Sequence, residues 1–339
     1  MVIEVNIPGN EYPIHIGKGL LEQADKMFSL NRKVLLVSDD GVPTKYVKTL
    51  AKVCPNSTIL ILKQGDANKN LAQYEKVLSV LSDNAFTRKD ALIAVGGGMV
   101  GDLAGFAAAT YMRGIDFYNV PTTLLSQVDS SIGGKVAVNL NGIKNIVGAF
   151  YQPKGVLIDP LTLDSLDDRL FNEGLVEAIK MAATNDPELF AFIENSKDAR
   201  ADVEHIIEGA LRIKKSVVEI DPRENGPRMV LNFGHTVGHA IETLGKGRYY
   251  HGEAVAMGMR YVISKEVEKR IMPLLSHLGL PVRDEFNAEE LISIIRHDKK
   301  ARDKGVNLCL LDELGKPRIE LTSMQEMERR IRRIKENEE

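Results

Sequence analysis

The first half of the chain alternates short apolar runs with amphipathic segments. The apolar runs are rich in β-branched residues and end in turn residues, and they predict strands at 34–40, 57–62, 91–98, 117–123 and 155–160. Between them lie segments of helical spacing, such as LAQYEKVLSVL at 71–81. Strands that alternate with helices in this way predict βαβ units and a parallel sheet.

The pattern changes after about residue 166. Apolar residues then recur at spacings of three and four, without strand alternation, in segments 171–183, 203–220, 235–244 and 252–267. We predict an α/β domain over residues 1–166 and a helical domain over residues 167–339, because a single core rarely extends over a chain of 339 residues. The terminal segment 323–339 predicts an ordinary surface helix.

Composition limits the classes of partner. With 44 basic and 47 acidic residues and a net charge of -3, the chain has no global attraction for nucleic acid or an anionic membrane. The N-terminus has no signal pattern, and no apolar run reaches the roughly 18 residues that a membrane helix needs. The two cysteines, Cys54 and Cys309, lack CxxC spacing, so a reducing cytoplasm is the expected compartment.

A glycine-rich turn follows the third predicted strand. Gly96, Gly98 and Gly101 have the GxGxxG spacing and precede the helical segment DLAGFAAATYM. Glycines there allow a pyrophosphate to approach the backbone, and the helix N-terminus favours its charge. Asp39 or Asp40, at the end of an earlier strand, could accept from ribose hydroxyls. The alternative is a tight turn that binds nothing.

Cations stand among small polar residues between positions 113 and 145. Arg113, Lys135 and Lys144 lie in segments rich in Gly, Ser and Thr that otherwise read as loops. This composition is typical of a backbone-lined anion pocket, and phosphate is the expected anion. Scattered surface lysines around ordinary turns are the alternative.

Three of the seven histidines lie between residues 235 and 251. His235 and His239 are four apart, so helical spacing places them on one face, and His251 follows soon after. Imidazoles with a nearby carboxylate suit a divalent cation such as zinc. Glu177 and Lys180 are three apart on a predicted helix. They form either an intrahelical ion pair or, in the sharper interpretation, a metal carboxylate and a substrate-binding lysine.

Six ordered blocks resemble the 3-dehydroquinate synthases, sugar-phosphate cyclases of the shikimate pathway. The blocks span residues 96–259 and read GGGMVGDLAGFAAATYMRG, VPTTLLSQVDSSIGGKVAVN, KNIVGAFYQP, GLVEAIK, LNFGHTVGHAIE and HGEAVAMGM. The resemblance implies an N-terminal α/β domain that binds NAD and a C-terminal helical domain, with the active site between them. It also implies a homodimer.

The implied reaction converts 3-deoxy-D-arabino-heptulosonate 7-phosphate to 3-dehydroquinate and phosphate. NAD oxidises the substrate transiently, phosphate is eliminated, the hydride returns, and an intramolecular aldol step closes the ring. A divalent metal ion, zinc or cobalt, would hold and acidify the reacting hydroxyl. The small-molecule sugar phosphate is the expected partner.

The resemblance assigns site residues by position. The metal ligands would be Glu177, His235 and His251, so His239 moves to the substrate. The NAD-binding positions are Asp39, Asp66, Lys69, Gly97, Gly98, Asp102, Thr122, Thr123 and Lys144. The substrate-binding positions are Asp129, Lys135, Asn145, Lys180, Lys214, Arg228, Asn232 and His239, with Arg113 reaching the neighbouring subunit's phosphate site. Lys135, Lys180, Arg228, Asn232 and His239 are expected to act in catalysis.

Departures from the family pattern are few. Asp66 replaces a usual Glu, and Pro222 replaces an acidic residue beside Glu224, which keeps the functional position. Asn307 stands where a basic residue usually approaches the substrate, and Lys299 or Lys300 could supply that charge instead.

Three other readings are open. Another sugar-phosphate cyclase, such as an inosose or valiolone synthase, would share the fold, metal and NAD. An iron-type or glycerol-type alcohol dehydrogenase has no need for the cations Arg113, Lys135, Lys214 and Arg228. A non-catalytic NAD sensor would have no reason to keep the metal ligands.

Overall fold

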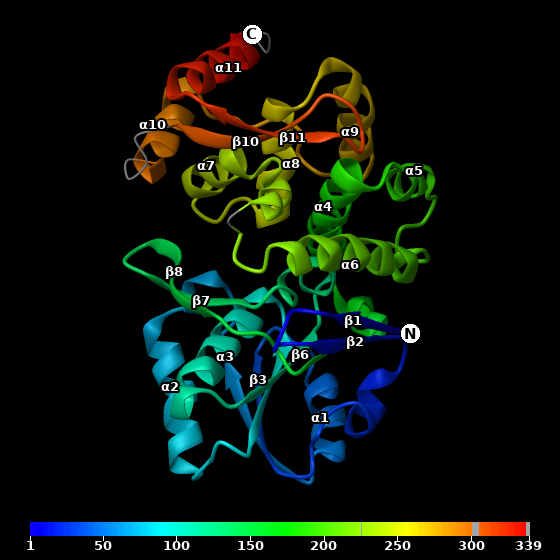
Figure 1. Cartoon of the computed structure of the whole chain (residues 1–339), viewed down its shortest axis with the longest axis vertical. Coiled ribbons are helices and arrows are strands. Elements are labelled where there is room, and N and C mark those ends of the chain that lie inside the picture. Colours follow the sequence, from blue (N-terminus) through cyan, green and yellow to red (C-terminus); the bar gives the residue numbers. More distant parts are fainter. Residues whose placement is uncertain (225, 300–304, 337–339) are drawn as a thin grey trace. The chain divides into compact units, whose positions relative to one another are not determined.

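The computed structural model in Figure 1 describes residues 1–224, 226–299 and 305–336. It divides into two compact units. Unit 1 comprises Met1–Asp167 and Val203–Arg223, and unit 2 comprises Asp168–Asp202 and Glu224–Glu339. The chain therefore leaves unit 1, returns to it for one helix, and leaves again. The single boundary predicted near residue 166 did not include this return.

Unit 1 contains a seven-stranded sheet in the order β1-β2-β9-β6-β5-β3-β4. All neighbouring strands are parallel except β1 and β2. The strands are β1 Val2–Val5, β2 Tyr12–Ile16, β3 Lys33–Asp39, β4 Asn56–Leu62, β5 Ala91–Gly96, β6 Asp116–Pro121 and β9 Gly155–Ile158. The parallel sheet predicted from the alternation of strands and helices is confirmed.

Helices cover both faces of this sheet. Leu35 and Val37 of β3 belong to the core formed with α2 and α3, whereas Val34 and Leu36 belong to the core formed with α1. In Figure 1, α1 and the pair α2 and α3 lie on opposite sides of β3. Because both faces are buried, these strands read as continuous apolar runs. The helices are α1 Thr44–Val53, α2 Leu71–Asp83, α3 Gly98–Thr110 and α6 Val203–Ile220.

An antiparallel hairpin occupies the region that the sequence suggested was loop. Its strands are β7 Lys135–Leu140 and β8 Ile143–Phe150. A Cβ at Gly148 would lie 2.3 Å from the carbonyl oxygen of Val136, so this close approach requires glycine. Short helical turns complete unit 1: η1 Leu20–Lys26, η2 Asp66–Asn68, η3 Tyr111–Arg113, η4 Ser126–Ser130 and η5 Pro160–Ser165.

Unit 2 is mainly helical, so the predicted fold class, α/β plus helical, is confirmed. Its helices are α4 Asp168–Asn185, α5 Pro187–Asn195, α7 His235–Gly245, α8 His251–Met259, α9 Lys265–His277, α10 Ala288–Lys299 and α11 Met324–Glu336, with short turns η6 Pro227–Asn232 and η7 Arg260–Val262. None of the helices within the described residues is long and apolar enough to cross a membrane.

The expectation that the second half contains no strand is wrong. β10 Val306–Leu311 and β11 Pro317–Thr322 form an antiparallel hairpin in unit 2. β10 is an apolar run with one exposed position, Asn307, and such a short run does not distinguish strand from helix by periodicity. Pairing with β11 along its whole length identifies it as a strand.

Candidate functional site

Three histidines of unit 2 meet near the starts of two helices. His235 begins α7, His239 lies one turn later, and His251 begins α8. One potential ligand atom from each lies within 4.8 Å of the others. The ring centroids of His235 and His239 are 5.2 Å apart, as are those of His235 and His251. The fold therefore joins the two histidine segments into one cluster.

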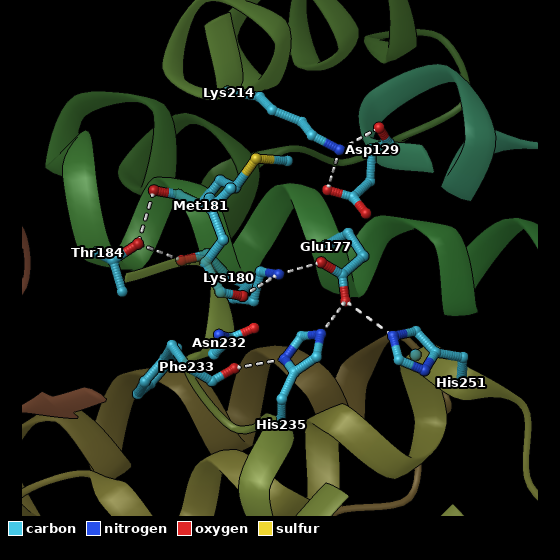
Figure 2. Close-up of polar contacts among 12 residues, drawn as sticks. Asp129, Glu177, Lys180, Met181, Thr184, Lys214, Asn232, Phe233, His235 and His251 are labelled. Carbon is cyan, nitrogen blue, oxygen red and sulfur yellow. Dashed lines mark hydrogen bonds and ion pairs between the residues drawn. The ribbon is translucent and has the colours of Figure 1, made fainter. Parts of the chain in front are cut away.

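Glu177 of α4 faces two of these histidines. Its side chain is completely buried, and Oε1 lies 3.8 Å from Nε2 of His235 and 3.7 Å from Nε2 of His251. Figure 2 shows both imidazoles directed at this carboxylate. Helical spacing alone had paired His235 with His239, and the tertiary structure adds a carboxylate from a helix about sixty residues earlier.

The chemistry of this cluster suits a divalent cation. Neither carboxylate oxygen of Glu177 has a hydrogen-bond partner among the described residues, although Lys180 forms an ion pair with it. A buried carboxylate is costly unless positive charge lies beside it. Burial lowers the pKa of His235, and the charges of Lys180 and His251 lower it further, so the ring is neutral and has a lone pair to offer a metal. Imidazole and carboxylate ligands of this kind are those of zinc and cobalt.

Hydrogen bonds orient the two rings. Nδ1 of His235 lies 3.1 Å from the carbonyl oxygen of Phe233, and Nδ1 of His251 lies 3.3 Å from Oε2 of Glu242. Each contact leaves Nε2 as the atom that faces Glu177. Burial by itself would lower the pKa of His251, but the hydrogen bond that its ring donates to Glu242 and the charge of Glu177 raise it overall.

Glycines allow α7 and α8 to pack closely enough to bring these histidines together. A Cβ on Gly258 of α8 would lie 2.2 Å from the carbonyl oxygen of Gly234 and 2.6 Å from the amide nitrogen of Gly238. Gly234, just before α7, has a φ of 79°, which favours glycine. The histidine cluster therefore depends on residues that carry no functional side chain.

Other expected substrate residues of unit 2 lie close to Glu177 in sequence or in space. Lys180 is 2% exposed, pairs with Glu177, and donates to the carbonyl oxygen of Leu231 over 2.6 Å. Asn232 donates from Nδ2 to Oε1 of Glu224 over 2.7 Å. Arg228 is buried in η6, in the same short turn as Asn232.

In unit 1, sheet register brings the expected NAD residues to one edge. β5 lies between β3 and β6 in parallel, so Asp39, the loop at Gly97, and Thr122 all follow the carboxyl ends of adjacent strands. Gly97 precedes α3 directly, and a Cβ there would lie 3.1 Å from Thr123 Cγ2. A ligand in an open parallel sheet binds at this edge. Burial raises the pKa of Asp39, whose carboxylate also accepts from the amide of Gly41 over 2.9 Å.

A chain of ion pairs links further expected NAD residues. Lys69 contacts Asp102 over 3.0 Å and Asp66 over 3.7 Å. Asp66 in turn contacts Lys144 over 3.3 Å and accepts from Asn139 over 3.1 Å. These contacts join the turn before α2, the start of α3 and the β7–β8 hairpin.

The expected substrate residues of unit 1 occupy several elements. Lys214 of α6 is buried and its ammonium group contacts Asp129 Oδ1 over 2.8 Å. Lys135 begins β7, and Asn145 of β8 has a φ of 54° and donates its amide to Asn139 over 2.9 Å. Arg113 is exposed, with a φ of 70°. The return of α6 to unit 1 explains why Lys214 meets Asp129.

Two carboxylates beside the histidine cluster were missed in the sequence. Glu173 of α4 shares a helical face with Glu177, four residues later, and Glu242 of α7 shares one with His239, three residues earlier. That spacing was the available signal in the sequence, but it does not distinguish a carboxylate beside a metal site from an ordinary surface carboxylate. Asn307 is exposed, and its amide lies 3.5 Å from Met229 Sδ. The side chain of Lys299 and all of Lys300 lie outside the described residues.

Comparisons with known proteins agree over nearly the whole chain. Residues 59–173 match the family model described as "3-dehydroquinate synthase N-terminal", and residues 174–301 match "3-dehydroquinate synthase C-terminal". A 3-dehydroquinate synthase of Clostridium acetobutylicum is 40% identical over 352 residues, which cover 97% of this chain and 99% of the relative. One of Streptococcus pneumoniae is 43% identical over 350 residues, with coverage of 96% and 98%.

The fold of this chain is also similar to that of a protein of solved structure. It is that of 2-deoxy-scyllo-inosose synthase complexed with carbaglucose-6-phosphate, NAD+ and Co2+. The TM-score is 0.87 at 26% identity, and the alignment covers 98% of this chain and 99% of the other.

Proposed function

Because the chain belongs to the 3-dehydroquinate synthase family, we propose that it converts 3-deoxy-D-arabino-heptulosonate 7-phosphate to 3-dehydroquinate and phosphate, using NAD and a divalent metal ion. The observation that carries this proposal is the buried carboxylate of Glu177 facing His235 and His251. A carboxylate and two imidazoles form a set of ligands suited to a divalent metal ion, and both parts of the chain match models of the same family.

We propose that NAD occupies the carboxyl edge of the unit 1 sheet, where it would accept a hydride from the substrate carbinol and later return it. The proposed NAD contacts are Asp39, Asp66, Lys69, Gly97, Gly98, Asp102, Thr122, Thr123 and Lys144. Their support is the shared sheet edge and the ion-pair chain through Lys69. Backbone amides at the start of α3 favour the pyrophosphate charge.

In the proposed metal site, Glu177, His235 and His251 would hold zinc or cobalt, which supplies Lewis-acid polarisation of the reacting hydroxyl. Lys180 stands beside Glu177 and offsets its charge. His239, on the same helix as His235 but exposed, would face the substrate. The known inosose synthase complex with Co2+ supports a metal of this class.

The proposed substrate contacts form two groups, according to the part of the substrate that they would bind. Lys135, Arg228 and Arg113, with His239 and Asn145, would bind the phosphate through charge-assisted hydrogen bonds. Lys180, Lys214 and Asn232 would orient the carboxylate and hydroxyls, and Asp129 holds Lys214 in place. Positioning matters because an acyclic intermediate has many conformations, and fixing the reactive one can lower the barrier by up to about 7–11 kcal/mol. Lys135, Lys180, Arg228, Asn232 and His239 are the proposed catalytic residues.

We also propose a homodimer in which Arg113 serves the partner's site. Its support is the exposed, left-handed backbone at Met112 and Arg113, held by a hydrogen bond from Arg88 Nε to the Met112 carbonyl over 2.9 Å. A mixture of Arg113→Ala and Glu177→Ala proteins tests this. If Arg113 acts across the interface, mixed dimers contain one intact site and activity returns. If it acts within its own subunit, no activity returns.

The proposed compartment is the cytoplasm. Both cysteines, Cys54 and Cys309, are free and buried, and burial raises their pKa to about 11 and about 12. Such thiols are unreactive and suit a reducing environment. Fractionation of the source cells, with detection of the protein in the soluble lysate, tests this assignment.

One assay tests the proposed function. Purified protein, the heptulosonate phosphate and catalytic NAD should release phosphate, and a chelator should abolish release until zinc or cobalt is restored. Accumulation of NADH in proportion to product would identify a dehydrogenase instead. Turnover of glucose 6-phosphate in place of the heptulosonate would identify an inosose-type cyclase. An active Glu177→Ala protein that still binds metal would contradict the ligand assignment.

A further inference from the structure

We propose that Glu242 is a positioning residue that orients His251 for metal binding, an inference that rests on the proposed metal site. Oε2 of Glu242 lies 3.3 Å from Nδ1 of His251. On the other side of the ring, Nε2 of His251 lies 3.7 Å from Oε1 of Glu177. One imidazole therefore stands between two carboxylates, and each carboxylate faces a different nitrogen.

This arrangement selects the tautomer of His251. An ionised carboxylate only accepts hydrogen bonds, so the proton resides on Nδ1 when Glu242 is bound there. In the neutral ring, Nε2 then carries the lone pair, and this nitrogen faces Glu177. A histidine that donates its second N–H to a carboxylate is also a more basic ligand, which strengthens its bond to a metal.

The other histidine ligand is held differently. Nδ1 of His235 lies 3.1 Å from the carbonyl oxygen of Phe233, which is neutral. Both proposed imidazole ligands thus direct Nε2 at Glu177, but the acceptors at Nδ1 differ. At Nδ1 the partner of His251 is charged and that of His235 is neutral, so removing the charge of Glu242 acts on the His251 ring.

Glu242 and the ring that it contacts belong to different helices, α7 and α8. Glu242 lies two helical turns after His235, and its side chain is 14% exposed. The start of α8 is held by other groups. Glu253 accepts from the amide of Tyr250 over 2.8 Å and pairs with Arg169 over 2.6 Å, and Glu173 accepts from the amide of Gly252 over 3.1 Å.

Two substitutions separate the possible roles. Glu242→Ala removes the acceptor, whereas Glu242→Gln keeps an acceptor oxygen but removes the charge. Glu266→Gln is the matched control, because Glu266 is 79% exposed on α9 and pairs with Lys269 at the surface. Each metal-free protein is titrated with Co2+ alone, and affinity is measured by calorimetry together with the visible absorption of the bound ion.

We expect Glu242→Ala to weaken Co2+ binding by about 10- to 100-fold and to change the visible spectrum. Glu242→Gln should lose less affinity than Glu242→Ala, and Glu266→Gln should bind as the parent does. In Zn2+-loaded protein with 15N-labelled histidine, the Nδ1–H resonance of His251 should be protected from exchange in the parent and lost in Glu242→Ala. A merely structural role would not produce this signature.

The outcomes are distinguishable. Co2+ binding by Glu242→Ala within about threefold of the parent, with an unchanged spectrum, overturns the inference while leaving the proposed function intact. If Glu242→Ala does not fold, judged by circular dichroism, Glu242→Gln decides by the same criteria. Absence of Co2+ binding by the parent overturns both the inference and the metal site. Normal Co2+ results without phosphate release overturn only the proposed reaction.

Discussion

The carboxylate of Glu173 accepts a hydrogen bond from the backbone amide of Gly252 over 3.1 Å and thereby joins α4 to the first turn of α8. Glu173 is 5% exposed, and burial raises its pKa to about 7. The approach of the two helices is close, because a Cβ on Gly252 would lie 2.0 Å from the Glu173 carbonyl oxygen. A carboxyl group with a raised pKa therefore contacts the first turn of α8.

This raised pKa predicts a pH-dependent effect of Glu173→Gln on the metal-free protein. The unfolded chain releases the proton near pH 4.5 and the folded protein near pH 7, so the parent loses stability as pH rises through that window. Glutamine stays neutral and keeps an acceptor for Gly252. At pH 8 the variant should be more stable than the parent by on the order of 3 kcal/mol, and at pH 4.5 the two should be similar.

Urea unfolding at both pH values measures this difference. Glu266→Gln, which removes an exposed carboxylate, should show no comparable change between pH 4.5 and 8. An equal effect of Glu173→Gln at both pH values would contradict the raised pKa.

Metal binding should stabilise the protein through Glu177. Zinc at about 100 times its dissociation constant should raise the free energy of unfolding by about 2.7 kcal/mol, because it binds only the folded state. In Glu177→Gln the same concentration should have little effect, since the charged ligand is lost. Thermal melts with and without zinc test this, and equal stabilisation of both proteins would contradict the ligand assignment.

The packing of α7 on α8 predicts an unfavourable effect of Gly258→Ala. Alanine is the better helix former by about 1 kcal/mol, but its Cβ would meet backbone atoms of Gly234 and Gly238, which cannot move aside easily. We expect a net loss of about 1–3 kcal/mol and weaker Co2+ binding. Gly17→Ala is the control, because a Cβ added there would lie 3.6 Å from its nearest neighbour, the Leu20 side chain, which is an ordinary contact. A higher melting temperature for Gly258→Ala would refute the packing argument.

The pair Lys69 and Asp102 predicts coupling in unit 1. Burial raises the pKa of Asp102, and Lys69, at 3.0 Å, opposes that rise. Lys69→Met should therefore destabilise the protein by about 2 kcal/mol, because a partly buried charge loses its partner. In a protein that already carries Asp102→Asn, Lys69→Met should lower the free energy of unfolding by less. A double-mutant cycle measures the coupling, and strictly additive effects would show that the pair contributes nothing.

Several features of the fold could be read directly from local pattern. The apolar runs at 34–40 and 91–98 predicted strands, and their alternation with helical segments predicted a parallel sheet. The hairpin β10–β11 could not be read in the same way. Its strands depend on each other for hydrogen bonds, and the run ending at Leu311 is too short for its periodicity to identify it.

The candidate site shows the same division. The spacing of His235 and His239 and the glycines before α3 were visible because each lies within one element or turn. The partnership of Lys214 with Asp129 was not visible, because α6 joins unit 1 only after the chain has begun unit 2. The contact of Glu242 with His251 depends on the packing of two helices.

Local patterns were enough to predict the strands of the parallel sheet, most of the helices and the side chains available for chemistry, since periodicity, turn glycines and side-chain type are local properties. Tertiary structure decided which imidazole nitrogen faces Glu177 and which carboxylates lie behind the rings. The physical reason is that the contacts of Glu177 and Glu242 with His251 join different helices, whose close approach is permitted by Gly252 and Gly258.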